Sequence, residues 1–142
     1  MKKRESVSNI MTKSVHTLNL TNNLEDAEKA FKSHNVRHLP VVSGKELIGM
    51  LSLTDLARIS FVDSYGEMND NEGTVDTAVY NMLTIEQVMA QKVETIDINA
   101  TIRDVAEVLS KREYHALPVV EDNKLVGIVT TTDLVKYLLE QY

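Results

Sequence analysis

Cysteine and tryptophan are absent from the 142-residue sequence, and only 5% of its residues are aromatic. Without cysteine the chain has no disulfide, no thiolate nucleophile and no sulfur ligand for a metal, as is common in a reducing compartment. Few aromatic rings leave few platforms on which nucleic-acid bases could stack. We therefore expect a core built mainly from aliphatic side chains.

Positive charge is also in short supply, because 15 Lys and Arg residues face 21 Asp and Glu residues, for a net charge of −6. Nucleic-acid binding needs a basic stripe to neutralise phosphates, so we expect no nucleic-acid partner. No apolar run approaches the roughly 20 residues of a membrane span, and polar residues follow Met1-Lys2-Lys3-Arg4 where a signal peptide would be apolar. We expect a cytoplasmic protein without a membrane partner.

The sequence does contain one segment twice, 78 residues apart. The hairpin-like stretch Val36-Arg37-His38-Leu39-Pro40-Val41-Val42 recurs as Tyr114-His115-Ala116-Leu117-Pro118-Val119-Val120. The same spacing relates Met11 to Met89 and Asp26 to Asp104. An internal repeat of this length indicates two copies of one structural unit.

The register defines two repeats, at 6–60 and 84–138, and a connector at 61–83. A unit of about 60 residues buries little surface by itself, so we expect the two repeats to share one core around a pseudo-twofold axis. Polar and acidic residues dominate the middle of the connector, which predicts a flexible loop at about 65–73. Helical spacing over 75–82 and the Thr84 to Gln87 capping box predict two short helices after that loop.

Each repeat shows the same order of hydrophobic periodicities. Alternation of apolar and polar residues predicts a strand at 15–18 and at 93–98. Apolar residues spaced by three and four predict a helix at 24–31 and at 102–109. Paired apolar runs predict hairpins at 39–53 and 117–129. The first helices have cap candidates at Thr21, Asn22 or Asn23, and at Asn99 or Thr101. A second helix is expected to open at Thr54 or Thr132. The predicted fold is therefore α/β (α+β), with strand, helix, strand, strand and helix in each repeat.

A polar motif, Gly-x-x-Ser/Thr-x-Thr-Asp, closes each hairpin. It comprises Gly49, Ser52, Thr54 and Asp55 in the first repeat, and Gly127, Thr130, Thr132 and Asp133 in the second. Glycine inside an apolar strand indicates close approach of a ligand or of another backbone. Thr54 and Thr132 can be helix N-caps, with each Asp favoured by the helix dipole. Alternatively, hydroxyls and free N–H groups hold a phosphate while each carboxylate accepts hydrogen bonds from a ribose.

Basic side chains stand close to both motifs. Arg58 and Lys136 follow the two aspartates by three residues, and Arg37 aligns with His115 before each Leu-Pro pair. His38 has no histidine counterpart, so the first repeat offers more positive charge. These residues can meet the phosphates of a ligand, or Arg58 and Lys136 can lie on solvated helix faces and His38 can be structural.

The repeated hydrophobic-Pro-Val-Val hairpin followed by Gly-hydrophobic-x-Ser/Thr-x-x-Asp resembles the cystathionine-β-synthase (CBS) domain, and the tandem resembles a Bateman module. The resemblance implies clefts that bind AMP, ADP or ATP, with or without Mg²⁺, or S-adenosylmethionine. It also implies roles for particular residues. Asp55 and Asp133 would bind the ribose, and Ser52 and Thr130 would contact the ribose or a phosphate. The adenine ring would lie against residues 17–20 and 95–98, which include Thr17 and Thr95, and against Leu39-Pro40 and Leu117-Pro118.

We expect a stand-alone regulatory sensor of adenine nucleotides that forms a homodimer and acts on an unknown partner protein. The sequence has no Walker A, His-Glu-x-x-His or Gly-x-Ser-x-Gly motif, so we expect no catalytic residues. Its four histidines, His16, His34, His38 and His115, lack metal-ligand spacing. The alternative function is a dimerisation or protein-interaction module with vestigial clefts.

Overall fold

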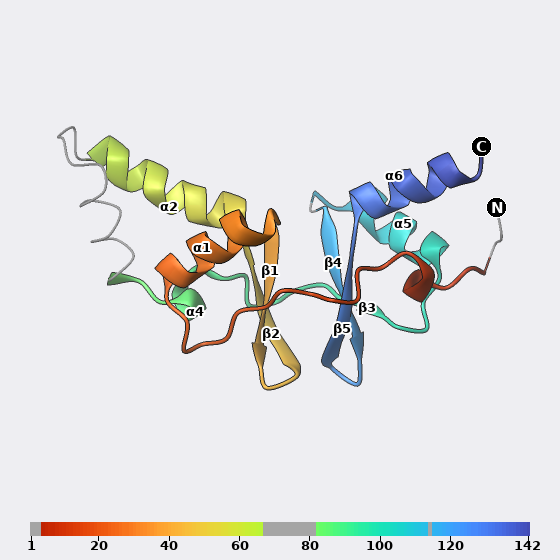
Figure 1. The fold of residues 1–142 in the computed structure, drawn as a ribbon, viewed down its shortest axis with the longest axis horizontal. Coiled ribbons are helices and arrows are strands. Elements are labelled where there is room, and N and C mark those ends of the chain that lie inside the picture. The colour runs from red at the N-terminus through yellow and green to blue at the C-terminus, as the bar shows by residue number, and fades with distance from the viewer. Residues whose placement is uncertain (1–3, 67–81, 114) are drawn as a thin grey trace. The chain divides into compact units, whose positions relative to one another are not determined.

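The computed structural model describes residues 4–66, 82–113 and 115–142 (Figure 1). In chain order its elements are a 3₁₀ turn at Val7–Asn9, α1 (Leu24–His34), β1 (His38–Ser43), β2 (Glu46–Ser52), α2 (Leu53–Gly66), α4 (Ile85–Val88), β3 (Ile96–Asp97), α5 (Ile102–Lys111), β4 (Ala116–Glu121), β5 (Lys124–Thr130) and α6 (Thr131–Glu140). The predicted mixed α/β fold is confirmed. From residue 67 to residue 81, the predicted loop and helix of the connector lie outside the described residues.

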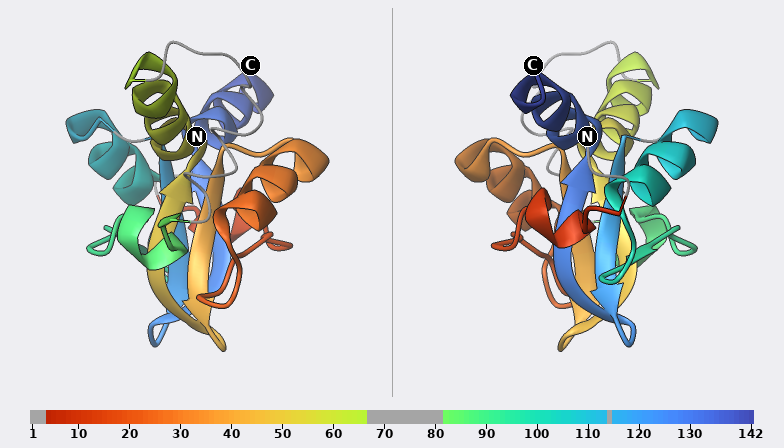
Figure 2. Two further views of the ribbon diagram at one scale, coloured as in Figure 1. Left: turned by 90° about the vertical axis from the view of Figure 1, so that its left-hand side faces the viewer. Right: turned by 90° about the vertical axis from the view of Figure 1, so that its right-hand side faces the viewer.

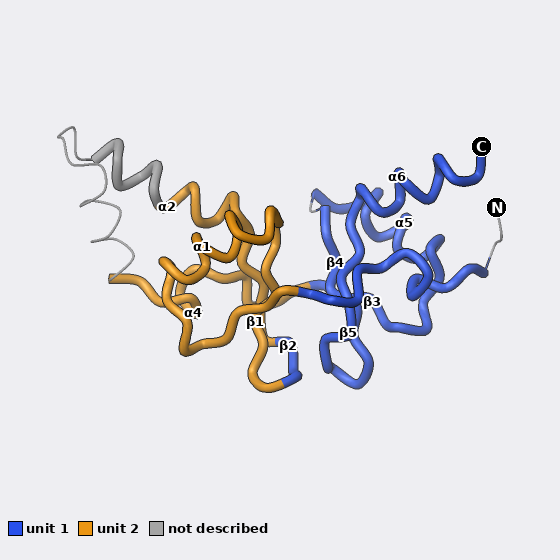
Figure 3. Tube along the Cα trace, viewed as in Figure 1, with its two compact units in different colours: residues 1–15, 45–47, 94–142 blue, residues 16–44, 48–93 orange. Residues whose placement is uncertain are grey.

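The chain forms two compact units, each of which combines parts of both repeats (Figure 3). Unit 1 comprises Met1–Val15, Lys45–Leu47 and Glu94–Tyr142, and unit 2 comprises His16–Gly44 and Ile48–Val93. The leading segment of each repeat therefore packs with the hairpin of the other repeat. No helix among the described residues is long and apolar enough to cross a membrane.

In unit 1, β4 and β5 form an antiparallel hairpin, and β3 runs parallel to β4 with Ile96 opposite Val119. The leading segment joins the same unit through an antiparallel bridge between Thr12 and Ile128. Val7 from this segment is fully buried and belongs to the unit's apolar cluster. The other buried members of that cluster are Ile96, Val105, Leu117, Val119 and Val129.

Unit 2 repeats this arrangement with the first hairpin. A parallel bridge joins Leu18 to Val41, and an antiparallel bridge joins Met50 to Ala90. Ile85, from the leading segment of the second repeat, is 1% exposed in the apolar cluster of this unit. The sequence predicted one core shared by the repeats, whereas the buried residues form one cluster in each unit. Each cluster is completed by exchange of leading segments.

The hairpin loop of each unit lies at the end opposite to the start of the second helix (Figure 2). This follows from the chain path, because β2 and β5 run away from their loops and pass directly into α2 and α6. The motif residues at the ends of these two strands are therefore placed at the helical end of each unit.

Capping boxes begin the first helix of each repeat and α4. The N-caps are Asn23, Thr101 and Thr84, and each accepts a hydrogen bond from the backbone of the third helical residue. The structure thus selects Asn23 and Thr101 from the predicted candidates and confirms the predicted box at Thr84.

Asp104, the third helical residue of α5, should make the stability of the protein pH-dependent. Hydrogen bonds from the Thr101 backbone and then from its side chain lower the pKa of Asp104 below 3.8, helped by Arg103 and opposed by desolvation. Because the folded state then binds fewer protons, this stabilisation is present above pH 3.8 and is lost as pH falls below it. Urea unfolding at pH 7 and pH 2.5 should show a smaller loss in Asp104→Asn than in the wild type. Equal losses would contradict the assignment.

Candidate functional site

In unit 2 the motif of the first repeat lies where β2 passes into α2. The Asp55 N–H donates to the Ser52 Oγ over 3.0 Å, and the Ser52 N–H donates to the Asp55 Oδ2 over 3.2 Å. Two reciprocal bonds of this kind form a capping box, which fixes the carboxylate over the first turn. Ser52 therefore caps α2, and the prediction of Thr54 as the cap is wrong. Thr54 is exposed inside the first turn.

In unit 1 the second motif has the same geometry at the start of α6. The Asp133 N–H donates to the Thr130 Oγ1 over 3.2 Å, and the Thr130 N–H donates to the Asp133 Oδ2 over 2.9 Å. Thr130 is the N-cap, so the prediction of Thr132 as the cap is wrong by the same two residues. Both aspartates are half-buried, and their position is set by local hydrogen bonds.

The start of each second helix lies against the residue that precedes the adjacent strand. The Leu53 N–H donates to the Arg37 carbonyl oxygen over 2.9 Å, and the Thr131 N–H donates to the His115 carbonyl oxygen over 2.9 Å. Arg37 and His115 have exposed side chains. The structure thus places the backbone of each of these basic residues beside the motif of its own repeat, and the predicted contact of their side chains with a ligand stays a prediction.

The Leu-Pro pairs occupy the strands behind the two motifs. Leu39 and Leu117 are fully buried in the apolar clusters, and Pro40 and Pro118 are also fully buried. These residues therefore help to build the core. Their predicted contact with an adenine ring stays a prediction.

The two threonines predicted at the adenine lie on segments that run beside the first strand of each hairpin. The Leu18 N–H donates to the Pro40 carbonyl oxygen over 2.9 Å, which places exposed Thr17 next to this pairing. Half-buried Thr95 directly precedes β3, which is paired with β4. Both threonines are thus near the Leu-Pro strand of their own unit.

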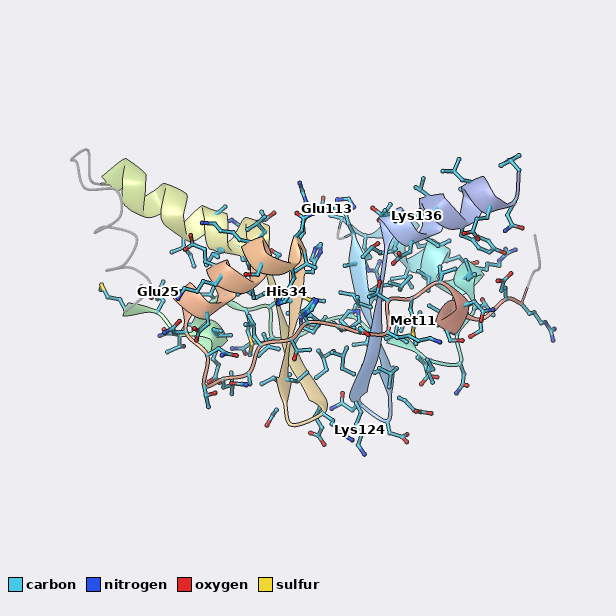
Figure 4. All side chains as sticks on the ribbon, viewed as in Figure 1. Met11, Glu25, His34, Glu113, Lys124 and Lys136 are labelled. Atoms are coloured by element: carbon cyan, nitrogen blue, oxygen red, sulfur yellow. The ribbon has the colours of Figure 1, made fainter. Side chains whose placement is uncertain are left out.

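Basic side chains differ between the two motifs. An Arg58 guanidinium nitrogen lies 3.8 Å from the Asp55 Oδ1, and its side chain is 70% exposed. Lys136 is exposed on α6 and makes no ion pair within the described residues (Figure 4). His38 is half-buried at the start of β1. The solvated position predicted as an alternative for Arg58 agrees with its exposure, and phosphate contacts of all three stay predictions.

Both motif glycines pack against another backbone. A Cβ on Gly49 would lie 2.9 Å from the Ala90 carbonyl oxygen, and one on Gly127 would lie 3.0 Å from the Thr12 carbonyl oxygen. Met89 and Met11, which are equivalent in the repeat, cover the two glycines. Both glycines therefore allow close approach of another backbone, which is one of the two predicted roles. A contact between these glycines and a ligand stays a prediction.

Sequence reasoning missed these methionine contacts. Their signal was the repeat spacing of 78 residues that relates Met11 to Met89, but nothing local indicated that each would pack on the opposite repeat's glycine. No group of three or more metal-ligating side chains is found in the part of the chain that the structure describes. The site therefore consists of two equivalent sets of hydroxyl, carboxylate and basic groups, one set in each unit.

A family model of the CBS domain matches the chain at residues 7–61 and 85–140. The uncharacterized protein MJ1232 of Methanocaldococcus jannaschii is 30% identical over 133 residues, which are 93% of this chain and 39% of that protein. The CBS domain-containing protein YhcV of Bacillus subtilis is 29% identical over 129 residues, 91% of this chain and 82% of YhcV. The chain thus spans less than half of the first relative and most of the second.

Among solved structures, the CBS domain pair of protein MJ0100 in complex with 5′-methylthioadenosine and S-adenosyl-L-methionine superposes with a TM-score of 0.76. It is 27% identical in sequence, and the match covers 96% of this chain and 98% of that one. Both matched segments carry the duplicated motif described above. The chain therefore belongs to the CBS domain family and contains a tandem pair of the domain.

Proposed function

We propose that the chain is a regulatory module that binds adenine nucleotides, AMP, ADP or ATP, and catalyses no reaction of its own. The observation that carries this proposal is the pair of aspartates at the starts of α2 and α6, each of which is held by a capping box. In each, one carboxylate oxygen is engaged in the capping box. The Asp133 Oδ1 accepts no hydrogen bond from the described residues, so it is available to a ribose hydroxyl.

The chemistry around the first motif favours a nucleotide over S-adenosylmethionine. MJ0100 binds two compounds that share an adenosine group, which supports adenosine as the common element. Arg37 and Arg58 add positive charge beside Asp55, and His38 follows Arg37. Guanidinium groups attract phosphate oxygens and repel the sulfonium of S-adenosylmethionine.

Nucleotides should raise the melting temperature of the protein. A ligand at about 100 times its dissociation constant stabilises the folded state by about 2.7 kcal/mol, which corresponds to roughly 5–11 °C for a chain near this size. Differential scanning fluorimetry should compare AMP, ADP, ATP, 5′-methylthioadenosine and S-adenosylmethionine, with GTP as the control for the base. A response to S-adenosylmethionine alone would change the ligand class. No response to any of them would favour the interaction module.

An exposed apolar stripe on α6 supports assembly as a homodimer. Val135, Leu138 and Leu139 are 50%, 43% and 69% exposed, and their spacing places them on one helix face. Lys136 and Glu140 flank this stripe. If two copies of α6 pack antiparallel about a twofold axis centred near residue 138, each Lys136 faces the other copy's Glu140, so the surface is self-complementary.

Light scattering should therefore give a particle of twice the 16.0 kDa chain mass. Replacing Val135 and Leu139 together by glutamate should yield monomers, because four like charges would meet in an apolar contact. The matched control is Leu20→Glu, which charges an exposed apolar position, 47% exposed, in unit 2. Monomeric wild type across micromolar concentrations would refute the dimer.

A further inference from the structure

Two pairs of residues that are equivalent in the repeat make different contacts at the same place in the fold. In unit 2 the rings of His16 and His34 stack, with centroids 3.5 Å apart and planes inclined by 8°. In unit 1 the residues 78 positions later are Glu94 and Arg112, and the Arg112 Nε lies 3.0 Å from the Glu94 Oε1. A histidine stack in one repeat thus replaces an ion pair in the other.

Both contacts tie the end of the first helix to the segment that carries a candidate ligand residue. His34 is the last residue of α1 (Figure 4), and Arg112 directly follows α5. Their partners, His16 and Glu94, each directly precede the threonine predicted at the adenine. We call these two contacts the brackets of unit 2 and unit 1.

The brackets differ in how they respond to protons. Glutamate and arginine keep their charges between pH 5 and pH 8, whereas imidazole is the side chain that commonly gains a charge in this range. Neutral rings stack favourably, but a second proton on the pair places two positive rings face to face. Protonation therefore weakens the bracket of unit 2 and leaves the bracket of unit 1 intact.

No acidic side chain among the described residues forms an ion pair or a hydrogen bond with either ring. Apart from their stack, the side chains of His16 and His34 make no hydrogen bond or ion pair with any other described residue. The charged and titratable groups on the same segment and on α1, β1 and α2, which pack together, are Lys13, Glu25, Asp26, Glu28, Lys29, Lys32, Arg37, His38, Asp55 and Arg58. Of the carboxylates, Asp26 is held in a capping box, Glu28 pairs with Lys32, and Asp55 pairs with Arg58.

We propose that the His16–His34 stack is a pH-sensitive bracket that regulates the nucleotide site of the first repeat. When both rings are neutral the stack holds the Thr17 segment against the end of α1, and protonation of both rings in mildly acidic solution releases this segment. The regulatory consequence rests on the proposed nucleotide-binding function, whereas the bracket itself does not. The two rings face each other only in the folded protein, so repulsion between two positive rings lowers the contribution of the bracket to stability as pH falls.

Exchange of the brackets tests the proposal. The double variant His16→Glu, His34→Arg installs the ion pair of unit 1 in unit 2, at two exposed positions. Between pH 7.5 and pH 5.0 the wild type should lose roughly 2–4 °C more in melting temperature than this variant. The single variant His34→Gln cannot place two positive rings face to face. Its loss of melting temperature should therefore also be roughly 2–4 °C smaller than that of the wild type. His38 and His115 are unchanged in all three proteins, so any effect of pH on them is common to the comparison.

The reciprocal exchange gives the opposite expectation. Glu94→His with Arg112→His should add a second pH-dependent loss of similar size to the wild type. If His16→Glu, His34→Arg and the wild type lose equal amounts on acidification, the bracket is not pH-sensitive and the proposal is overturned.

Binding of AMP separates the bracket from its regulatory role. In the Asp133→Ala background, which leaves the first motif intact, AMP affinity should fall on acidification about 5-fold more with the histidine pair than with the Glu-Arg pair. The ratio between the two proteins removes the titration of AMP itself. A pH-dependent melting temperature with unchanged affinity ratios would retain the bracket and reject regulation. Absence of AMP binding at both pH values would instead reject the proposed function.

Discussion

Replacement of Gly49 by alanine should destabilise the protein by about 2–3 kcal/mol, although only one methyl group is added. The new Cβ would lie 2.9 Å from the Ala90 carbonyl oxygen and would also meet the Met89 side chain. The backbone cannot retreat without loss of the bonds by which Met50 and Ala90 pair, at 3.1 and 2.9 Å. The effect is therefore steric, and urea unfolding at 25 °C measures it.

Gly44→Ala is the control that separates crowding from backbone conformation. Gly44 has φ of +64°, where a side chain costs about 1–2 kcal/mol, but nothing lies within 4 Å of its Cβ position. Gly49 is outside the left-handed region, so backbone conformation alone predicts that Gly44→Ala loses more stability than Gly49→Ala. Crowding predicts the opposite order. A smaller loss of stability for Gly49→Ala than for Gly44→Ala would show that the backbone around Gly49 and Ala90 shifts at little cost, which would contradict the prediction.

Asp133→Ala should lower nucleotide affinity about 10-fold to 100-fold at the second motif. The carboxylate would otherwise accept charge-assisted hydrogen bonds from ribose, each of which contributes about 1.5–3 kcal/mol. Isothermal titration calorimetry with AMP measures the loss. The same substitution removes half of a capping box, which costs about 0.5–2 kcal/mol of stability.

Asp104→Ala is the matched control, because Asp104 completes the same kind of capping box with Thr101 at the start of α5. It should cost similar stability and leave AMP affinity unchanged. If Asp133→Ala and Asp104→Ala bind AMP equally well, the role of Asp133 is confined to capping, and Asp55 should then be tested in the same way.

Most elements of the fold were predictable because they have a local signature. The strand predicted at 15–18 is wrong, because the structure forms only a single bridge there, between Leu18 and Val41, and the strand predicted at 93–98 is limited to Ile96–Asp97. Apolar spacing predicted the first helices within a few residues, and the duplicated hairpins emerged from the repeat. The caps of α2 and α6 were misplaced because two hydroxyl residues stand near each strand end. The spacing of three between Ser52 and Asp55 was the better guide, since a capping box requires it.

The pairing of leading segments with hairpins could not be predicted in the same way. Met11 meets a glycine in the second hairpin, but the first hairpin offers an equivalent glycine at the same register. Hydrophobic periodicity describes one segment at a time. It cannot indicate which of two equivalent hairpins a leading segment packs against. For the same reason the sequence could not tell which repeat would complete which apolar cluster.

Because leading segments are exchanged, a single repeat does not contain all of the residues that form either apolar cluster. A single repeat holds either Val7 or Ile85 but lacks the hairpin cluster that buries it, since each side chain fills the cluster of the other repeat. A single repeat could complete the same cluster only by trading segments with a second copy. Because both repeats lie on one chain, the trade is intramolecular, which raises the effective concentration of the two segments.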